Sequence, residues 1–213
     1  MDNFKIALHH DDLPKKLEIS NVIALNAKIV KGKLYYLQLT NEGLQLTNDG
    51  LQLTNGGDTV HIVQFTHNAP YDAPNLLNIL ANPEIQKIFH LDKDELISLG
   101  KCLKTTPVNL FSIKIASQLA YPTVQENSLQ ALLKELLNVE LDNRIEQTDW
   151  TSPSIYIDVF DYLADNVRYL HKLKKTLMAI SSKNDTTTPI TKACKELEDE
   201  VCTELHGFFS NCE

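Results

Sequence analysis

The hydrophobic pattern predicts an α/β fold, with a mixed sheet flanked by helices and a helical C-terminal part. Short apolar runs rich in β-forming residues fill the first part of the chain, and apolar residues at helical spacing fill the last part. Between them the two patterns alternate, which is typical of a sheet with helices packed on it. With 213 residues, of which 43% are hydrophobic, the chain is long enough for one domain with a sizeable core.

Strands are expected where apolar β-formers run between turn residues. A short edge strand over residues 4–8 is closed by "HHDDLP", and further strands are expected over 21–26, 33–40, 58–66 and 85–90. The stretch "NVIALNAKIV" is the most informative, because its apolar run ends in Asn26 and Lys28. The carboxyl ends of central strands are where ligands bind in open α/β sheets.

Helices are expected where apolar residues recur at steps of three and four. A short helix lies in "APNLLNILANPEI", stopped by Asn82-Pro83, and another begins near Asp92. Helical spacing continues over residues 113–120, 128–138 (with Ser128 as N-cap) and 156–180. A last helix begins near Pro189, and its apolar stripe, expected to dock on the rest of the domain, consists of Ile190, Cys194, Leu197, Val201, Leu205 and Phe208.

A tandem repeat interrupts the strand region. Three near-identical heptads, "LQLTNEG", "LQLTNDG" and "LQLTNGG", occupy residues 37–57. Each LQLT suits a short strand, and the Asn-Asp-Gly and Asn-Gly-Gly segments suit turns. We interpret residues 44–57 as a duplicated insertion in a hairpin connection; the alternatives are a binding loop or a pairing edge.

Composition limits the classes of partner. The net charge is −8, whereas nucleic-acid binders usually present a basic face. The four cysteines lack CxxC spacing and are expected to be reduced thiols. No apolar run is long enough to span a membrane, and the N-terminus lacks the features of a secretory signal, so a cytoplasmic location is expected.

The order of motifs resembles a known family, the short bacterial ribonuclease D type of 3′–5′ exonuclease, in the tyrosine-containing branch of the DEDD superfamily. The likeness runs from about residue 5 to residue 177. It rests on "LHHDDLP", "VIALNAK", "LYYLQLT", "VHIVQF", "YDAPNLLNILANPEIQKIFHLDKDEL", "FSIKIASQLA", "SLQALLKELLNVEL", "EQTDW" and "DYLADNVRYLHKL". The resemblance implies a ribonuclease H-like fold over residues 1–180. The apolar stripe predicts that residues 181–213 form a helical tail packed on the same domain.

The resemblance also implies a chemistry, hydrolysis of a terminal phosphodiester with two Mg or Mn ions held by four carboxylates. The family's Asp-x-Glu pair falls on Asn26 and Lys28. Its third carboxylate falls on Glu95 and its fourth on Asn166, whereas the tyrosine that helps orient the attacking water is retained as Tyr162. These positions sum to zero charge, where the family has −4.

That shortfall predicts the loss of the metals. Two dications about 3.5–4 Å apart repel each other by roughly 16 kcal/mol at an effective dielectric of about 20, so they need a dense set of anionic ligands. Lys28 places an ammonium at one ligand position, and we expect no metal cofactor. We also expect Lys28 to pair with Glu95, with their charged atoms within about 4 Å.

Neighbouring carboxylates are not expected to restore the site. Asp165 lies about 100° around the helix from Asn166, off the site face. Asp92 and Asp94 flank Glu95 at a helix start, where negative charge favours the helix dipole; the alternative is a relocated single-metal site. "HHDD" is interpreted as a surface turn.

Three functions remain open from the sequence. The first is an inactive homologue, a pseudoenzyme that binds single-stranded RNA or DNA weakly through Lys28, Lys114, Trp150 and Tyr162. The second is a residual Mn-dependent 3′–5′ exoribonuclease that uses Glu95. The third is a scaffold without nucleic acid, which uses the repeat or the C-terminal stripe to bind a protein, including a second copy of itself as a homodimer.

Overall fold

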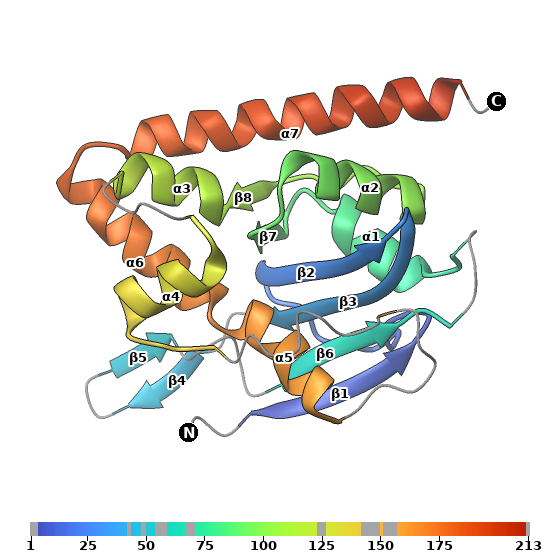
Figure 1. The fold of residues 1–213 in the computed structure, drawn as a ribbon, viewed down its shortest axis with the longest axis horizontal. Coiled ribbons are helices and arrows are strands. Elements are labelled where there is room, and N and C mark those ends of the chain that lie inside the picture. The colour runs from blue at the N-terminus through green and yellow to red at the C-terminus, as the bar shows by residue number, and fades with distance from the viewer. Residues whose placement is uncertain are drawn as a thin grey trace.

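A six-stranded mixed sheet forms the centre of the protein (Figure 1). The computed structural model describes residues 4–41, 44–47, 50–53, 59–66, 71–122, 127–141, 150 and 157–211. The strand order is β1-β6-β3-β2-β7-β8, and β3 alone runs antiparallel to its neighbours. These strands are β1 (Lys5–His10), β2 (Val22–Val30), β3 (Lys33–Asn41), β6 (Thr59–Gln64), β7 (Gln86–Phe89) and β8 (Leu110–Ser112).

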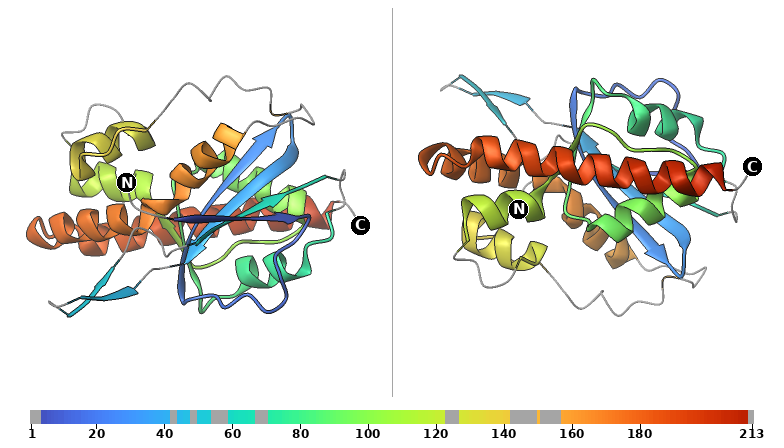
Figure 2. Two further views of the ribbon diagram at one scale, coloured as in Figure 1. Left: turned by 90° about the horizontal axis from the view of Figure 1, so that it is seen from below. Right: turned by 90° about the horizontal axis from the view of Figure 1, so that it is seen from above.

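Helices cover both faces of this sheet (Figures 1 and 2). One face packs against helices α3, α4, α5 and α6, and the other packs against α1 and α2. The seven described helices are α1 (Pro74–Ala81), α2 (Lys93–Leu103), α3 (Ile113–Ala120), α4 (Leu129–Leu137), α5 (Ile157–Arg168), α6 (Leu170–Lys183) and α7 (Thr187–Ser210).

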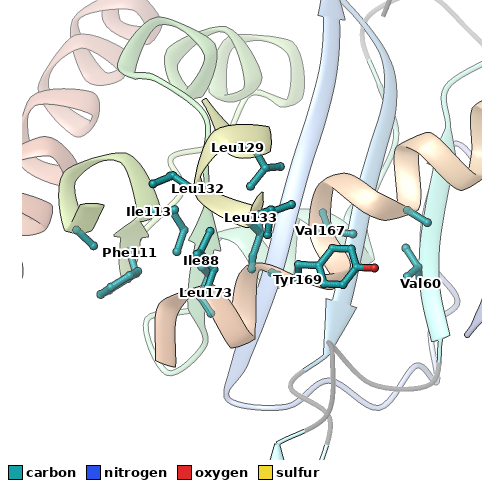
Figure 3. Close-up of a cluster of buried hydrophobic side chains, with 14 of the residues drawn as sticks. Val60, Ile88, Phe111, Ile113, Leu129, Leu132, Leu133, Val167, Tyr169 and Leu173 are labelled. Carbon is teal, nitrogen blue, oxygen red and sulfur yellow. The ribbon is translucent and has the colours of Figure 1, made fainter. Parts of the chain in front are cut away.

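Each face of the sheet has its own apolar core, because successive strand residues point to opposite sides. In β2, Ala24 belongs to one core, whereas Ile23 and Leu25 belong to the other. Figure 3 shows the first core, where Leu132 and Leu133 of α4 and Leu173 of α6 pack around Ile88 of β7. This core supports the strands from beneath the candidate site.

Helix α7 lies across the edge of the sheet and joins both cores. Ile190 and Cys194 belong to the first core, and Val201 and Leu205 belong to the second. The predicted stripe therefore does pack on the domain, although Phe208 at its end is 39% exposed. The helix also satisfies the edge strand β8: the backbone N–H of Leu110 donates to the Glu198 carboxylate, and that of Ser112 donates to Cys194 Sγ.

Several expectations about the strands and helices were wrong. The second strand does not stop at residue 26 but continues to Val30, because β3 pairs with it along that length. It closes in a two-residue turn at Lys31 and Gly32, both with φ > 0 as a type I′ hairpin requires. The expected helix 156–180 is two helices broken at the buried Tyr169, and no proline or glycine there signals the break. Strand β8, three residues long, was not anticipated.

The part of the chain that connects β3 to β6 contains the repeat and forms a separate two-stranded sheet. Strand β4 (Leu44–Thr47) pairs antiparallel with β5 (Gly50–Leu53), so the second and third LQLT units supply one strand each. The first unit belongs to β3. Residues 42–43, 48–49 and 54–57 of the repeat lie outside the described residues, as do Cys212 and residues 146–149 of "EQTDW".

The "HHDD" segment is a turn only in its second half: His9 and His10 belong to β1, which was expected to end at residue 8, and Asp11 and Asp12 follow the strand. The Asp11 carboxylate accepts hydrogen bonds from the backbone and hydroxyl of Thr66. Asp12 accepts the N–H groups of Asn75 and Leu76 and thereby caps helix α1 from a distant loop. Among the described residues, no helix combines the length and the apolarity needed to cross a membrane.

Candidate functional site

A cavity of about 600 Å³ opens at the carboxyl end of β7. It brings together all five positions at which the sequence resembles the family's catalytic residues: Asn26, Lys28, Glu95, Tyr162 and Asn166. They come from β2, the start of α2, and α5, which lie far apart in the chain. Lys114 lines the same cavity.

Strand lengths explain why the cavity forms here. Strand β7 pairs with β2 only as far as Ala24, so β2 extends past its neighbour. Asn26 and Lys28 lie on this extension and, two residues apart, on the same face of the strand. The register with β3 shifts between Lys28 and Ile29, which is a bulge of the kind that redirects a strand near functional sites.

Amide groups stand at two of the positions that the resemblance assigns to the family's carboxylates. Asn26 Nδ2 donates to Oε1 of Gln38, its neighbour across the β2–β3 ladder, at 2.9 Å. Gln38 is fully buried, and its Nε2 finds no hydrogen-bond partner among the described residues. Asn166 Nδ2 donates at 3.1 Å to the backbone carbonyl of Tyr162, one turn back along α5.

Glu95 is the one carboxylate among the described residues that line the cavity. Its side chain accepts the backbone N–H of Asp92 at 2.9 Å, and the Asp92 carboxylate accepts the N–H of Glu95 at 3.0 Å. Together these bonds form a capping box that begins α2. Asp92 thus caps the helix, as the helix-dipole interpretation anticipated.

The predicted ion pair between Lys28 and Glu95 was wrong. Among ion pairs between described residues, none joins these two side chains. Lys28 Nζ instead lies 4.6 Å from the centre of the Trp150 ring, in cation–π geometry. The helix start holds Glu95 in the capping box, and the aromatic ring attracts Lys28.

Trp150 is a core residue, 6% exposed. Its ring packs against the edge of Tyr36 at 6.2 Å and against Tyr162 at 6.0 Å between centroids. The ring, enclosed in this way and covered by Lys28, does not offer a free face on which a base could stack. Its place in the site is to support Lys28.

Lys114 and His90 complete the wall between β7 and α3. Lys114 Nζ lies 3.7 Å from the Asp92 carboxylate and is partly exposed. His90 Nε2 lies 2.8 Å from the backbone carbonyl of Asn127. Burial, reinforced by the nearby charge of Lys114, lowers the pKa of His90 to about 4, so the imidazole is neutral at pH 7. The titratable side chains of the described lining therefore carry one net positive charge.

This donor set does not fit a pair of divalent cations. Within the described ranges, no three His, Cys, Asp or Glu side chains gather closely enough to hold a metal ion. Asp165 lies off the cavity, as predicted from its place on the helix, and pairs with Arg168 at 3.1 Å. An amide oxygen can ligate Mg²⁺, but it brings no charge to offset the repulsion between two ions.

The sequence did not point to Gln38 or to the first turn of α4 as part of the site. Asn127, Ser128 and Gln130 line the cavity, and the Ser128 side chain caps α4 by accepting the N–H of Ala131. The N-cap was predicted, and it was the available signal that a helix N-terminus, with its positive dipole end, lies nearby. Its approach to the cavity depends on the tertiary fold.

Comparison with known proteins agrees with this architecture. Residues 16–181 match the family model described as 3′–5′ exonuclease. A ribonuclease D of Desulfotalea psychrophila (strain LSv54 / DSM 12343) is 29% identical over 108 residues, which are 51% of this chain and 29% of that protein's length. The match thus spans less than a third of that curated relative.

Solved structures extend the likeness to nearly the whole chain. Brucella melitensis NrnC is 25% identical with a TM-score of 0.80, covering 96% of this chain and 95% of that one. NrnC bound to pGG gives 25% identity and a TM-score of 0.79. Escherichia coli RNase D, at 22% identity, has a TM-score of 0.65 over 85% of this chain and 45% of its own. The ribonuclease H-like exonuclease fold expected from the sequence is confirmed.

Proposed function

This chain belongs to the ribonuclease D-like 3′–5′ exonucleases, and from that premise we propose that it is a non-catalytic member of the family. In this proposal it binds the end of a short single-stranded nucleic acid weakly in the cavity and does not hydrolyse it. The loss of activity and the retention of binding have separate physical grounds.

The content of the cavity supports the loss of activity. The family's four carboxylate positions are occupied here by Asn26, Lys28, Glu95 and Asn166, and all four line one cavity. A single carboxylate and an ammonium replace the anionic ligands that a two-metal site requires. Because these side chains already lie together, a small closure of the site would not supply the missing charge.

The residual-enzyme alternative depends on Glu95, and its hydrogen bonds count against it. The carboxylate already accepts the Asp92 N–H in the capping box. Recruiting it to a single metal would weaken the start of α2 and would still leave one charged ligand. The absence of a second described carboxylate in the lining favours the inactive form.

The charge of the cavity supports binding. Lys28 and Lys114 both line it, so a phosphate in the cavity would meet two ammonium groups despite the overall charge of −8. Brucella melitensis NrnC, a relative that matches nearly the whole chain, is known bound to pGG. A cavity of about 600 Å³ is large enough for one or two nucleotides.

The experiment restores the missing charges. The triple variant Asn26→Asp, Lys28→Glu, Asn166→Asp has the family's four carboxylates, with Glu95 in the third place. We expect the wild-type protein to leave labelled RNA and DNA oligonucleotides intact with Mg²⁺ or Mn²⁺ and to show no saturable Mn²⁺ binding by calorimetry. We expect the triple variant to bind Mn²⁺, because its site charge returns to −4.

Degradation by the wild-type protein would contradict the proposal if it required metal and disappeared in Glu95→Gln. That single variant removes the one carboxylate among the described lining residues with little change in shape. Contaminating nuclease would be unaffected by it, so the comparison separates the two sources of cleavage.

A further inference from the structure

We propose that the cavity binds a phosphate group without any divalent cation, with the Lys28 ammonium acting in place of the family's metal ions. The inference rests on the proposed function and specifies how the same cavity recognises its ligand. Three features of the described residues carry it: the support under Lys28, the Asn26–Gln38 amide pair, and the helix start beside them.

The first feature is a rigid support for the ammonium. Lys28 Nζ lies 4.6 Å above the Trp150 ring, and Trp150 is itself fixed by Tyr36 and Tyr162. A lysine side chain held against an aromatic face loses little further freedom when an anion binds, which reduces the entropic cost of binding. An exposed lysine on the surface lacks this advantage.

The second feature is the amide pair under the cavity. As oriented, Asn26 Nδ2 donates to Gln38 Oε1, and the fully buried Gln38 Nε2 has no partner among the described residues. A buried donor without a partner is costly. If both amides turn over, Gln38 Nε2 donates to Asn26 Oδ1, and Asn26 Nδ2 is released to donate to an anion in the cavity.

After that rearrangement, the asparagine at residue 26 could bind a phosphate directly. An aspartate at residue 26 would repel a phosphate unless a metal lay between them, whereas an asparagine can donate a hydrogen bond to it directly. The same reasoning applies at residue 28, where an ammonium attracts the phosphate that a carboxylate would repel. Both changes shift the site from holding cations to holding an anion.

The third feature is the start of α4. Ser128 and Gln130 line the cavity at the N-terminal turn of this nine-residue helix. Backbone N–H groups and the positive end of the helix dipole favour anions at such a position. Together with Lys114, which lines the same cavity, this turn favours the binding of an anion there.

The test measures binding of pGG with and without metal. Calorimetry of the full-length protein is carried out with pGG in EDTA and again with millimolar Mg²⁺, and we expect equal or weaker affinity with Mg²⁺. Lys28→Gln should weaken binding about tenfold or more, since it removes a charge-assisted contact, and Lys28→Arg should restore most of it. Lys31→Gln, at the exposed β2–β3 turn outside the cavity lining, is the matched control and should leave the affinity unchanged.

Two further ligands identify the source of the phosphate. Inorganic phosphate should compete with pGG if a terminal phosphate occupies the site. A GG dinucleotide without the 5′-phosphate should bind as well as pGG if the internal diester occupies it. Either result supports the proposal, provided that the affinity depends on Lys28.

Two results would overturn this inference and leave the proposed function standing. One is binding that requires Mg²⁺. The other is an affinity of Lys28→Gln equal to that of the wild type, with the fold of the variant shown to be intact by circular dichroism. Absence of binding under both conditions would overturn the binding part of the proposed function as well. Metal-dependent cleavage of pGG would overturn its catalytic part.

Discussion

Lys28 shows at the scale of one residue how a substitution changes both its charge and its partners. The family resemblance implies that the ammonium of Lys28 stands where the family has a metal ligand. The prediction that Lys28 pairs with Glu95 was wrong, because that carboxylate accepts a hydrogen bond from the backbone N–H of Asp92 at the start of its own helix. The cation lies over Trp150 instead, more than a hundred residues away in the chain.

Buried histidines determine the acid stability that we predict at this scale. His171 is 2% exposed, its Nε2 lies 3.2 Å from the Thr40 carbonyl, and burial lowers its pKa from 6.5 to about 4. Because the unfolded chain binds the proton more readily, the folded state loses stability as pH falls from about 6.5 to about 4. The neutral His171 imidazole contributes about 3 kcal/mol to the free energy of unfolding above about pH 6.5, and this contribution is lost by about pH 4.

His171→Gln should therefore make the unfolding free energy less dependent on pH, measured by urea denaturation at about pH 7 and about pH 4.5. His90, whose pKa is lowered in the same direction, contributes a second such loss in the wild type, so His90→Gln should have a similar effect. If the unfolding free energies of the variants depend on pH as that of the wild type does, these histidines are not the cause of the loss of stability at low pH.

Helix α7 illustrates what matters at the scale of the element. Its periodic stripe predicted that it packs on the domain, and Ile190, Cys194, Val201 and Leu205 do so. Helix α7 also accepts hydrogen bonds from two backbone N–H groups of the edge strand β8, through Glu198 and Cys194. The apolar stripe did not predict this second role. An edge covered in this way is protected from pairing with other chains.

Two glycines test how closely the helices pack. A Cβ at Gly100 of α2 would lie 2.4 Å from Leu205 Cδ1 and 2.8 Å from the Thr105 carbonyl oxygen, whereas a Cβ at Gly207 of α7 would meet nothing within 4 Å. Gly100→Ala should therefore destabilise the protein by about 1–3 kcal/mol. Gly207→Ala should stabilise it by about 0.5–1 kcal/mol through helix propensity alone.

Urea unfolding of the two variants beside the wild type measures both effects. The same chemical change with opposite signs separates packing from propensity. Equal shifts at the two positions would mean that α2 and α7 are not in the tight contact described.

The whole molecule carries a negative charge that the cavity does not share. The overall charge of −8 argues against broad electrostatic binding of nucleic acid, yet the lining holds Lys28 and Lys114 beside a single described carboxylate. Binding should therefore be confined to one or two phosphates. Affinity gained through longer oligonucleotides should be small, because the remaining surface is acidic on average.

The salt dependence of the binding constant measures how many phosphates contact the protein. Each phosphate contact to a single strand contributes a slope of about −0.7 in log K against log salt, so two lysines predict a slope of about −1.4. Fluorescence anisotropy with a labelled oligonucleotide should show about a sevenfold loss of affinity between about 50 and 200 mM salt. A slope several times steeper would reveal an extended basic groove that the proposal does not contain.

The sequence by itself determined the fold class, most of the strands and helices, and the family resemblance. These follow from local periodicity and from motif order, which survive without knowledge of contacts. It missed the break at Tyr169 and the length of β2, because the same local pattern is compatible with a continuous helix or a shorter strand. In both cases, packing and strand pairing decided the outcome.

Only the tertiary structure decided how the site is assembled. The residue types at 26, 28, 95 and 166 were readable in order, and so was their missing charge. The contacts of Lys28 with Trp150 and of Asn26 with Gln38 depend on strand register and on a buried aromatic cluster formed by distant segments. Composition fixes how much charge a site contains, but the geometry of its neighbours decides where each charge lies and what it can bind.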